Sequence, residues 1–237
     1  MQIYPVTNIS FGKLQTHKEK KKVLVDNFQD ENYRYKVEKT KSKHNDNLYR
    51  LCIIPLNINN DLLYKAHQVF EVANPIFVDR MHTDLEERNK GLGTRMHLIN
   101  IVEMLENNYS GIELLSLEES ISFHAKFGFY PDGKWDKGLK NNIMVISKEE
   151  DPEFKKYADK AKQILNVENL YDFARDKLAN QLLYDYSRAI LGVKNETQLR
   201  NTFKSPISMK LSKRRILENK DFYNDLFKKY GIDYEIT

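Results

Sequence analysis

The distribution of glycine constrains this chain more than any other feature of its sequence. Only nine of the 237 residues are glycine, and six of these fall between positions 91 and 138. Gly91 and Gly93 stand one residue apart, behind a strand-like run (76–83) and at the start of a helical apolar pattern. Glycine permits backbone conformations and close approaches that a Cβ atom forbids. We therefore expect the chemistry of the protein to lie in this strand, loop and helix.

The composition indicates a globular chain, since 41% hydrophobic residues are enough to bury a core. The longest apolar runs, such as 51–56, are far too short to span a bilayer, and the N-terminus lacks the basic-then-apolar order of a secretory signal. We expect a cytoplasmic protein with no membrane segment. A single cysteine, Cys52, excludes an internal disulfide and a multi-thiolate zinc site.

The net charge is +4, but the charges are unevenly distributed along the chain. Residues 1–60 carry 11 Lys and Arg against 6 Asp and Glu, residues 61–150 carry 10 against 15, and residues 151–237 carry 17 against 13. Basic ends around an acidic middle are compatible with a nucleic-acid partner, but solvated lysine-rich surfaces produce the same pattern. The basic run 210–215 has no neighbouring aromatic stacking platform and supports nucleic-acid binding only weakly.

The first third of the chain is predicted to be rich in strands. Residues 1–31 read as a basic N-terminal arm with one short strand at 22–25. The β-rich runs 33–39 and 48–54 flank a polar turn and predict a hairpin. An Asn-capped helix is expected over 59–70, and the next strand over 76–83.

Strand alternation assigns the side chains of 76–83 to two faces. On this pattern one face carries Phe77, Asp79, Met81 and Thr83, and the other carries Val78, Arg80 and His82. After the glycine loop, Leu92 and Met96 begin an apolar pattern of helical spacing that continues to Leu105, wide enough for burial on more than one side.

Further elements are expected between the helix and residue 150. They are a buried strand at 111–117, a helix opened by a Ser116/Glu119 capping box and ended at Gly128, and a closing strand at 141–147. Asp151 and Pro152 suit the start of a new helix, so a boundary is expected near 150. Residues 150–237 are predicted to be an all-helical extension, with helices after 152 and at 168–191, 195–203 and 218–230.

A strand that leads through a glycine turn into a helix presents backbone N–H groups with no partner inside the helix, and such groups bind anions, most often phosphates. Glycines at 91 and 93 let oxygen atoms approach the backbone, and Arg88 and Lys90 add positive charge. The loop is not a Walker loop, because no Gly-Lys-Ser/Thr follows, and it lacks the third glycine of a dinucleotide fingerprint.

The run Arg88-Asn89-Lys90-Gly91-Leu92-Gly93 resembles the Arg/Gln-x-x-Gly-x-Gly/Ala signature of the GNAT superfamily of N-acetyltransferases. The segment FHAKFGFYP (123–131) is similar to the Phe-Tyr-x-Lys-x-Gly-Phe segment of that family. The two motifs stand about 35 residues apart. The resemblance covers roughly 33–148, and it leaves the extension unmatched. It implies a mixed, mostly antiparallel sheet flanked by helices over 32–149.

The resemblance also implies an acyl-CoA site. The diphosphate of acetyl-CoA would lie on the backbone amides of the loop, and the pantetheine arm would run beside the end of the preceding strand. The implied cofactor-binding residues are Met81, His82, Thr83, Arg88, Asn89, Lys90, Gly91, Leu92, Gly93 and Thr94. The family uses neither a metal nor a covalent intermediate, because a neutral amine attacks the thioester carbonyl directly.

Two residues are the catalytic candidates. His124 occupies the position where the family often has a tyrosine that protonates the CoA sulfur, and an imidazolium can supply that proton; equally, His124 can be a packed histidine at a helix end. Asp79 is placed to relay an amine proton through water, although an Asp paired with lysine looks identical in sequence. His82 faces the other way and is a weaker candidate base. Leu117 stands near the position of the family's pantetheine-binding asparagine.

The sequence thus predicts an acyl-CoA-dependent N-acyltransferase with an amine acceptor. One alternative is a GNAT-like module that binds CoA but has lost catalysis. Another is an acetyltransferase for a nucleic-acid-linked amine such as aminoacyl-tRNA. The helical extension could cover one sheet face, form a homodimer contact or wall the acceptor site.

Overall fold

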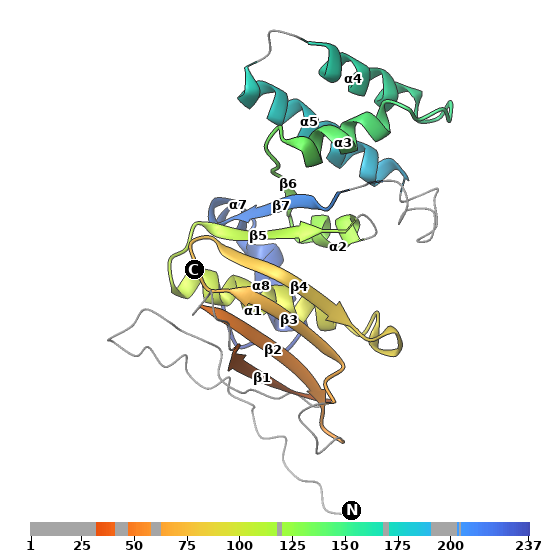
Figure 1. The fold of residues 1–237 in the computed structure, drawn as a ribbon. Helices are drawn as coiled ribbons and strands as arrows, with labels where there is room; N and C mark the ends of the chain where they lie inside the picture. Colours follow the sequence, from red (N-terminus) through yellow and green to blue (C-terminus); the bar gives the residue numbers. More distant parts are fainter. Residues whose placement is uncertain are drawn as a thin grey trace, which may run out of the picture. The chain divides into compact units, whose positions relative to one another are not determined.

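The protein is described here by a computed structural model that covers residues 32–40, 47–57, 63–117, 120–167, 171–190, 203 and 205–237. The predicted arm (1–31), with its strand at 22–25, lies outside the described residues, as does nearly all of the predicted helix 195–203. The described chain forms two compact units (Figure 1). One contains residues up to 112 together with 213–237, and the other contains 113–212.

The first unit is built on four strands in the order β1-β2-β3-β4, each antiparallel to its neighbour. They are β1 (Tyr33–Lys39), β2 (Leu48–Pro55), β3 (Ala66–Glu71) and β4 (Ile76–Thr83). The predicted hairpin is confirmed, with Lys36 opposite Cys52. A short 3-10 helix, η1 (Leu85–Glu87), leads from β4 towards α1 (Leu92–Glu106).

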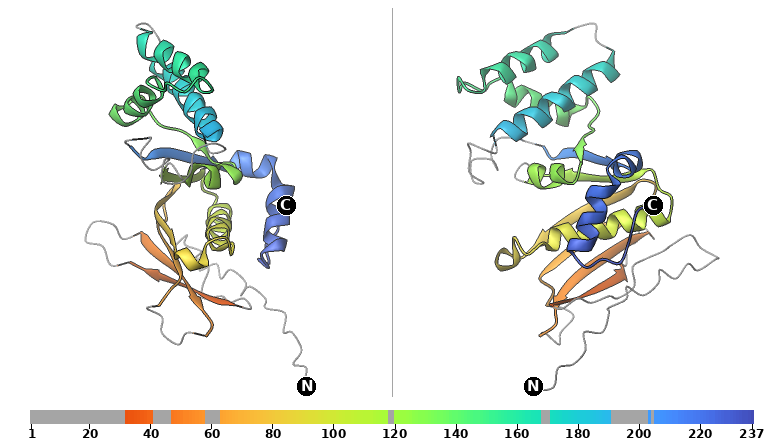
Figure 2. Two further views of the ribbon diagram at one scale, coloured as in Figure 1. Left: turned by 90° about the vertical axis from the view of Figure 1, so that its right-hand side faces the viewer. Right: turned by 180° about the vertical axis from the view of Figure 1, so that it is seen from behind.

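Helix α1 lies between the four strands and α8 (Lys220–Lys229), as the left view of Figure 2 shows. It contacts β3 and β4 on one side and α8 on the other. Consecutive residues from Met96 to Met104 are buried, so the prediction of burial on more than one side is confirmed. The unit is completed by α7 (Lys213–Glu218), which precedes α8.

The second unit combines three strands, in the order β5-β7-β6, with helices. Its elements are β5 (Gly111–Ser116, of which the first two residues belong to the first unit), α2 (Ile121–Lys126), β6 (Tyr130–Pro131), α3 (Lys137–Ile146), α4 (Lys155–Asn166), α5 (Asp172–Ile190) and β7 (Ile207–Ser212). β6 and β7 are antiparallel, and α3, α4 and α5 contact one another. The fold class is therefore mixed α/β with mostly antiparallel strands and flanking helices, as predicted.

The predicted helix over 59–70 is wrong for its described part, because Ala66–Glu71 is strand β3. Ala66, Gln68 and Phe70 are fully or almost fully buried while the residues between them are half-buried, which is the two-residue period of a strand. β3 pairs with β2 on one side and β4 on the other. Ladder hydrogen bonds on both sides outweigh the local helix signal.

The predicted strand 141–147 is also wrong, since these residues belong mainly to helix α3. The side chain of Asp136 caps this helix by accepting a hydrogen bond from the Leu139 N–H at 2.9 Å. Leu139, Ile143 and Ile146 are buried at helical spacing. The apolar residues of this run fit the period of a strand as well as that of a helix. The cap formed by Asp136 favours the helix.

Two smaller corrections concern caps and the extension. Ser116 does not cap a helix: it ends β5, its Oγ donates to the Leu117 carbonyl, and α2 begins only at Ile121. The C-terminal helices are present, but the extension is not entirely helical because Ile207–Ser212 forms strand β7. The alternation of buried and half-buried residues in β7 is that of a strand in a sheet.

Candidate functional site

A β-bulge in β4 changes where the predicted site residues point. Val69 on β3 pairs with Arg80, but the next residue, Phe70, pairs with Val78. Asp79 is therefore an extra residue without a counterpart on β3, and its side chain is exposed. Bulges of this kind redirect side chains and are common beside functional sites.

The bulge makes the predicted division of β4 into two faces wrong. Cross-strand partners share a face, so Met81 lies on the face of its partner Gln68, and Thr83 on the face of Ala66. This is the buried face, which α1 covers. Phe77, predicted to share a face with Met81 and Thr83, lies instead on the face of His82.

His82 lies on the opposite face of the sheet, as expected. Its ring is 5.5 Å from the ring of His67, its cross-strand partner, and its Nε2 atom is 3.6 Å from Asp84 Oδ1. Burial, followed by the nearby His82, lowers the pKa of His67. Within the described ranges, no group of three or more His, Cys, Asp or Glu side chains is arranged to hold a metal ion.

The glycine loop contains two residues in the left-handed region. Asn89 has a φ of 66°, and Gly91, which stands at the N-cap of α1, has a φ of 80° and a ψ of 11°. Arg88 between η1 and Asn89 is extended. Left-handed residues among right-handed or extended ones turn successive backbone N–H groups towards one side, which forms a concave anion-binding arrangement. Of the two glycines on which the loop was predicted, Gly91 has this left-handed geometry, whereas Gly93 lies within α1.

The first turn of α1 has donors without acceptors. No side chain caps the helix, because its N-cap is glycine, and the first hydrogen bond at this end runs from the Arg95 N–H to the Gly91 carbonyl at 3.0 Å. Among the described residues, the N–H groups of Leu92, Gly93 and Thr94 have no acceptor. Such groups, together with the positive end of the helix dipole, form a site for an anionic group.

The carboxylate of Glu87, just before the loop, contacts the side chains of Tyr33 and Lys90. The Tyr33 hydroxyl donates to Glu87 Oε2 at 2.6 Å, and Lys90 Nζ lies 3.0 Å from the same carboxylate oxygen. The hydrogen bond from Tyr33 and, to a smaller extent, the one from Lys90 lower the pKa of Glu87, which is therefore ionised at neutral pH. The charge of Lys90, predicted to serve an anion, is compensated by Glu87 in this conformation.

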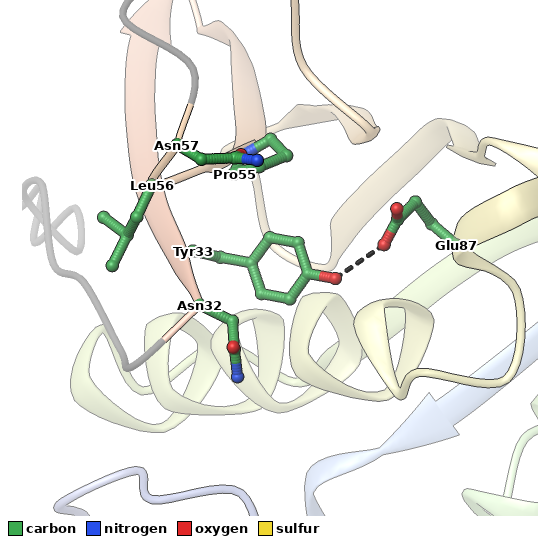
Figure 3. Close-up of a pocket in the computed structure, with 6 residues that line it drawn as sticks. All are labelled: Asn32, Tyr33, Pro55, Leu56, Asn57 and Glu87. Atoms are coloured by element: carbon green, nitrogen blue, oxygen red, sulfur yellow. Dashed lines mark hydrogen bonds between the residues drawn. The ribbon is translucent and has the colours of Figure 1, made fainter.

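An open cavity of about 350 Å³ lies beside the Tyr33–Glu87 contact (Figure 3). Its lining residues come from the start of β1, the end of β2 and η1, and are Asn32, Tyr33, Pro55, Leu56, Asn57 and Glu87. The contact across it joins the edge of the sheet to η1 and so helps to place the residues that follow Glu87, which form the loop.

A second distant residue lies against the loop in the described chain and, like Tyr33, was missed by sequence reasoning. Tyr230, at the end of α8, lies against Gly91, and Arg95 in the first turns of α1 donates through Nη1 to the Tyr230 carbonyl at 2.7 Å. Arg95 and Tyr230 are 135 residues apart, and no local pattern links them. Among the contacts described at this loop, the one between Glu87 and Lys90 is local, since the two residues are three positions apart, and sequence spacing can indicate it.

His124 belongs to the second unit, in α2, and its side chain is buried. The rings of Phe123 and Phe129 surround it edge-on, with centroids 5.2 and 5.9 Å away. Burial lowers the pKa of His124 to about 4. The imidazole is therefore almost entirely neutral at neutral pH, which favours a packing role and makes it a poor acid in this conformation.

The second motif has the local structure expected of it. Helix α2 ends at Lys126, and Gly128 follows with a φ of 84°. The Phe129 N–H donates to the His124 carbonyl at 3.3 Å and the Gly128 N–H to the Ala125 carbonyl at 2.9 Å, which closes the helix end with a left-handed glycine. Leu117, at the position of the missing asparagine, is 58% exposed.

Solved structures are similar to part of this chain. No protein-family model matches the chain, and no curated protein sequence matches it. Among solved structures, Tetrahymena GCN5 is similar at 17% identity over 38% of this chain and 56% of its own, with a TM-score of 0.32. A Klebsiella pneumoniae protein described as an acyl-CoA N-acyltransferase reaches 12% identity over 45% and 67%, with a TM-score of 0.32.

A third solved structure, nourseothricin acetyltransferase, is 13% identical over 48% of this chain and 77% of its own, with a TM-score of 0.33. In the described part of the chain, no helix is long and apolar enough to cross a membrane.

Proposed function

We propose that this protein is an acyl-CoA-dependent N-acyltransferase that moves an acetyl group from acetyl-CoA to an amine. The observation that carries the proposal is the uncapped first turn of α1. There, the N–H groups of Leu92, Gly93 and Thr94 have no acceptor in the described chain, directly after the left-handed Gly91. A diphosphate supplies acceptors of the right charge for these donors.

The resemblance of 88–93 to the GNAT signature supports the diphosphate of CoA, rather than that of another nucleotide, as the proposed anion. Met81 and Thr83 at the end of β4 lie one short helix before the loop and would flank the pantetheine arm. Arg88 and Lys90 would add positive charge to the site. Lys90 would do so after leaving its ion pair with Glu87 and binding a phosphate oxygen instead.

In the proposed reaction a neutral amine attacks the thioester carbonyl carbon, a C–N bond forms and the C–S bond breaks. One proton leaves the amine nitrogen and one reaches the departing sulfur, so an amide and a thiol are the products. The chain's part is to hold the donor, stabilise the oxyanion and move these protons. Asp79 remains the proposed relay for the amine proton, and its exposure at the bulge supports this role.

The proposed role of His124 as the acid for the sulfur requires a protonated imidazole, which is scarce well above a pKa of about 4. This observation favours a second candidate function, a module that binds CoA without turning it over. Leu117 in place of the family's asparagine points the same way.

Thiol release separates the two candidates. The protein is mixed with acetyl-CoA and a panel of amines that includes alkylamines, amino acids, peptide N-termini and aminoacyl-tRNA, and the free thiol is followed with a chromogenic disulfide. The matched control is Gly93→Asp, which would place a carboxylate at the anion site. Amine-dependent thiol release that this control lacks supports the transferase. CoA binding without release supports the module.

A further inference from the structure

Tyr230 and Gly91 approach each other more closely than two ordinary residues can. A Cβ atom placed on Gly91 would come within 2.4 Å of Tyr230 Cε1 and 3.1 Å of Tyr230 Oη. Real Cβ atoms essentially never make the first of these contacts, so the phenol ring fits here only because residue 91 is glycine. The ring thus lies directly beside the N-terminus of α1, where the proposed anion site begins.

The α1 helix itself holds the ring in place. Arg95, one turn into α1, donates from Nη1 to the Tyr230 carbonyl at 2.7 Å, and its guanidinium carbon lies 5.3 Å from the centre of the Tyr230 ring. Both contacts join α1 to the end of α8, so the ring and the first turn of α1 are fixed relative to each other.

The hydroxyl of Tyr230 is a donor that the described chain leaves without a hydrogen-bond partner. This contrasts with Tyr33 and Tyr234, whose hydroxyls donate to Glu87 and Glu106. Two cations lie close to the same ring, Arg95 and, with its Nζ 5.7 Å from the ring centre, Lys229. An O–H donor on a ring that two cations approach, next to Gly91 at the start of α1, fits an anion rather than a second donor or an apolar group.

We propose that Tyr230 is a further donor-binding residue, whose hydroxyl donates to the diphosphate of acyl-CoA while the first-turn amides of α1 bind the same group. This proposal rests on the proposed function. Arg95 acts as the positioning residue, because it fixes the ring through the Tyr230 carbonyl and the ring face. The missing side chain of Gly91 leaves the space that the Tyr230 ring occupies.

The test is calorimetric titration of the full chain with CoA, using the parent and Tyr230→Phe. The phenylalanine ring keeps the packing against Gly91 and removes only the O–H. A hydrogen bond to a charged group accounts for roughly tenfold in affinity, so we expect the Kd for CoA to rise by about that factor. The control is Tyr234→Phe, which loses its bond to Glu106 at 2.9 Å and should bind CoA like the parent.

The same titrations with 3′-dephospho-CoA locate the contact. An equal loss for both ligands in Tyr230→Phe places the hydroxyl on the diphosphate, whereas a loss confined to CoA would overturn that assignment in favour of the 3′-phosphate. An unchanged Kd in Tyr230→Phe would show that the hydroxyl does not bind the donor. Tighter binding in Tyr230→Ala would show instead that the ring obstructs the site.

Failure of this inference is distinguishable from failure of the proposed function. If the parent does not bind CoA, the proposed function is wrong and the role of Tyr230 is overturned with it. If the parent binds CoA, Gly93→Asp does not, and Tyr230→Phe binds like the parent, the anion site stands and only the inference about Tyr230 is overturned.

Discussion

Gln68 on β3 and Asn100 on α1 exchange two hydrogen bonds inside the core, one of 2.7 Å from Gln68 Nε2 to Asn100 Oδ1 and one of 3.1 Å in return. Both side chains are fully buried. The pair joins the sheet to the helix whose first turn forms the proposed anion site. It therefore positions the site from within the core.

We expect Asn100→Leu to destabilise the protein by about 1–3 kcal/mol, because it leaves the buried Gln68 amide without its partner. The double variant Gln68→Leu/Asn100→Leu removes both polar groups and should recover much of that loss. Urea unfolding of the parent, the two single variants and the double variant measures the coupling. Additive losses in the double variant would contradict a cooperative pair.

The buried carboxyl of Glu103 on α1 makes the free energy of unfolding depend on pH. It is 2% exposed, and burial raises its pKa to about 8, although Asn107 Nδ2 donates to its Oε1 at 2.9 Å. The ordinary pKa is 4.5, so between pH 4.5 and about 8 the unfolded chain releases a proton that the folded chain keeps. The free energy of unfolding contributed by this group therefore falls as the pH rises through that window.

Glu103→Gln removes this titration. The variant should gain stability relative to the parent as the pH is raised from 4.5 to 8, while below 4.5 the two should respond to pH alike. Thermal unfolding at a series of pH values checks the sign. A constant difference in Tm across the whole range would show that the carboxyl is not held neutral.

Gly91→Ala tests the contact between the loop and α8. A left-handed φ costs a residue with a side chain about 1–2 kcal/mol, and the added methyl would also overlap the Tyr230 ring. We expect a loss larger than the backbone cost alone, partly recovered in Gly91→Ala/Tyr230→Ala. The control is Gly133→Ala, where the nearest atom to a new Cβ, Asn180 Oδ1, is 3.5 Å away. Equal stabilities of Gly91→Ala and the parent would contradict this packing.

His124→Ala distinguishes a packed histidine from an acid. Because the pKa is lowered to about 4, we expect no change near neutrality in the pH dependence of kcat when His124 is replaced. We expect instead a stability loss on the order of 2–5 kcal/mol, as for other large-to-small core substitutions. A folded variant whose kcat falls roughly 10²–10⁴-fold, with KM for acetyl-CoA little changed, would assign the acid role to His124 after all.

The central strand, loop and helix were predictable because their signals are local. The residues 76–83 alternate as a strand, Gly91 and Gly93 mark the turn, and the apolar spacing from Leu92 onwards is helical over many residues. The strand, the left-handed Gly91 and the helix are present in the structure, although Gly93 lies within α1 and the bulge at Asp79 interrupts the alternation of β4. The anion-binding reading followed from the same local features, since uncapped amides and left-handed residues are properties of the backbone itself.

The remaining features depend on partners distant in sequence. Strand β3 exists because β2 and β4 pair with it, and the bulge at Asp79 is a property of the pairing rather than of β4 alone. The approach of Tyr230 to Gly91 joins the end of the chain to its middle. Likewise, the low pKa of His124 arises from burial that no spacing of residues encodes.

The most direct test of the proposed anion site is a titration of isotope-labelled protein with CoA, followed by amide NMR. We expect saturable shifts that are largest for the amides of Leu92, Gly93 and Thr94, because new hydrogen bonds to an anion move amide protons downfield. Pantetheine, which lacks the diphosphate, should leave these three signals in place. CoA binding that leaves the three amide signals unmoved, or an absence of CoA binding, would show that the first turn of α1 is not the anion site.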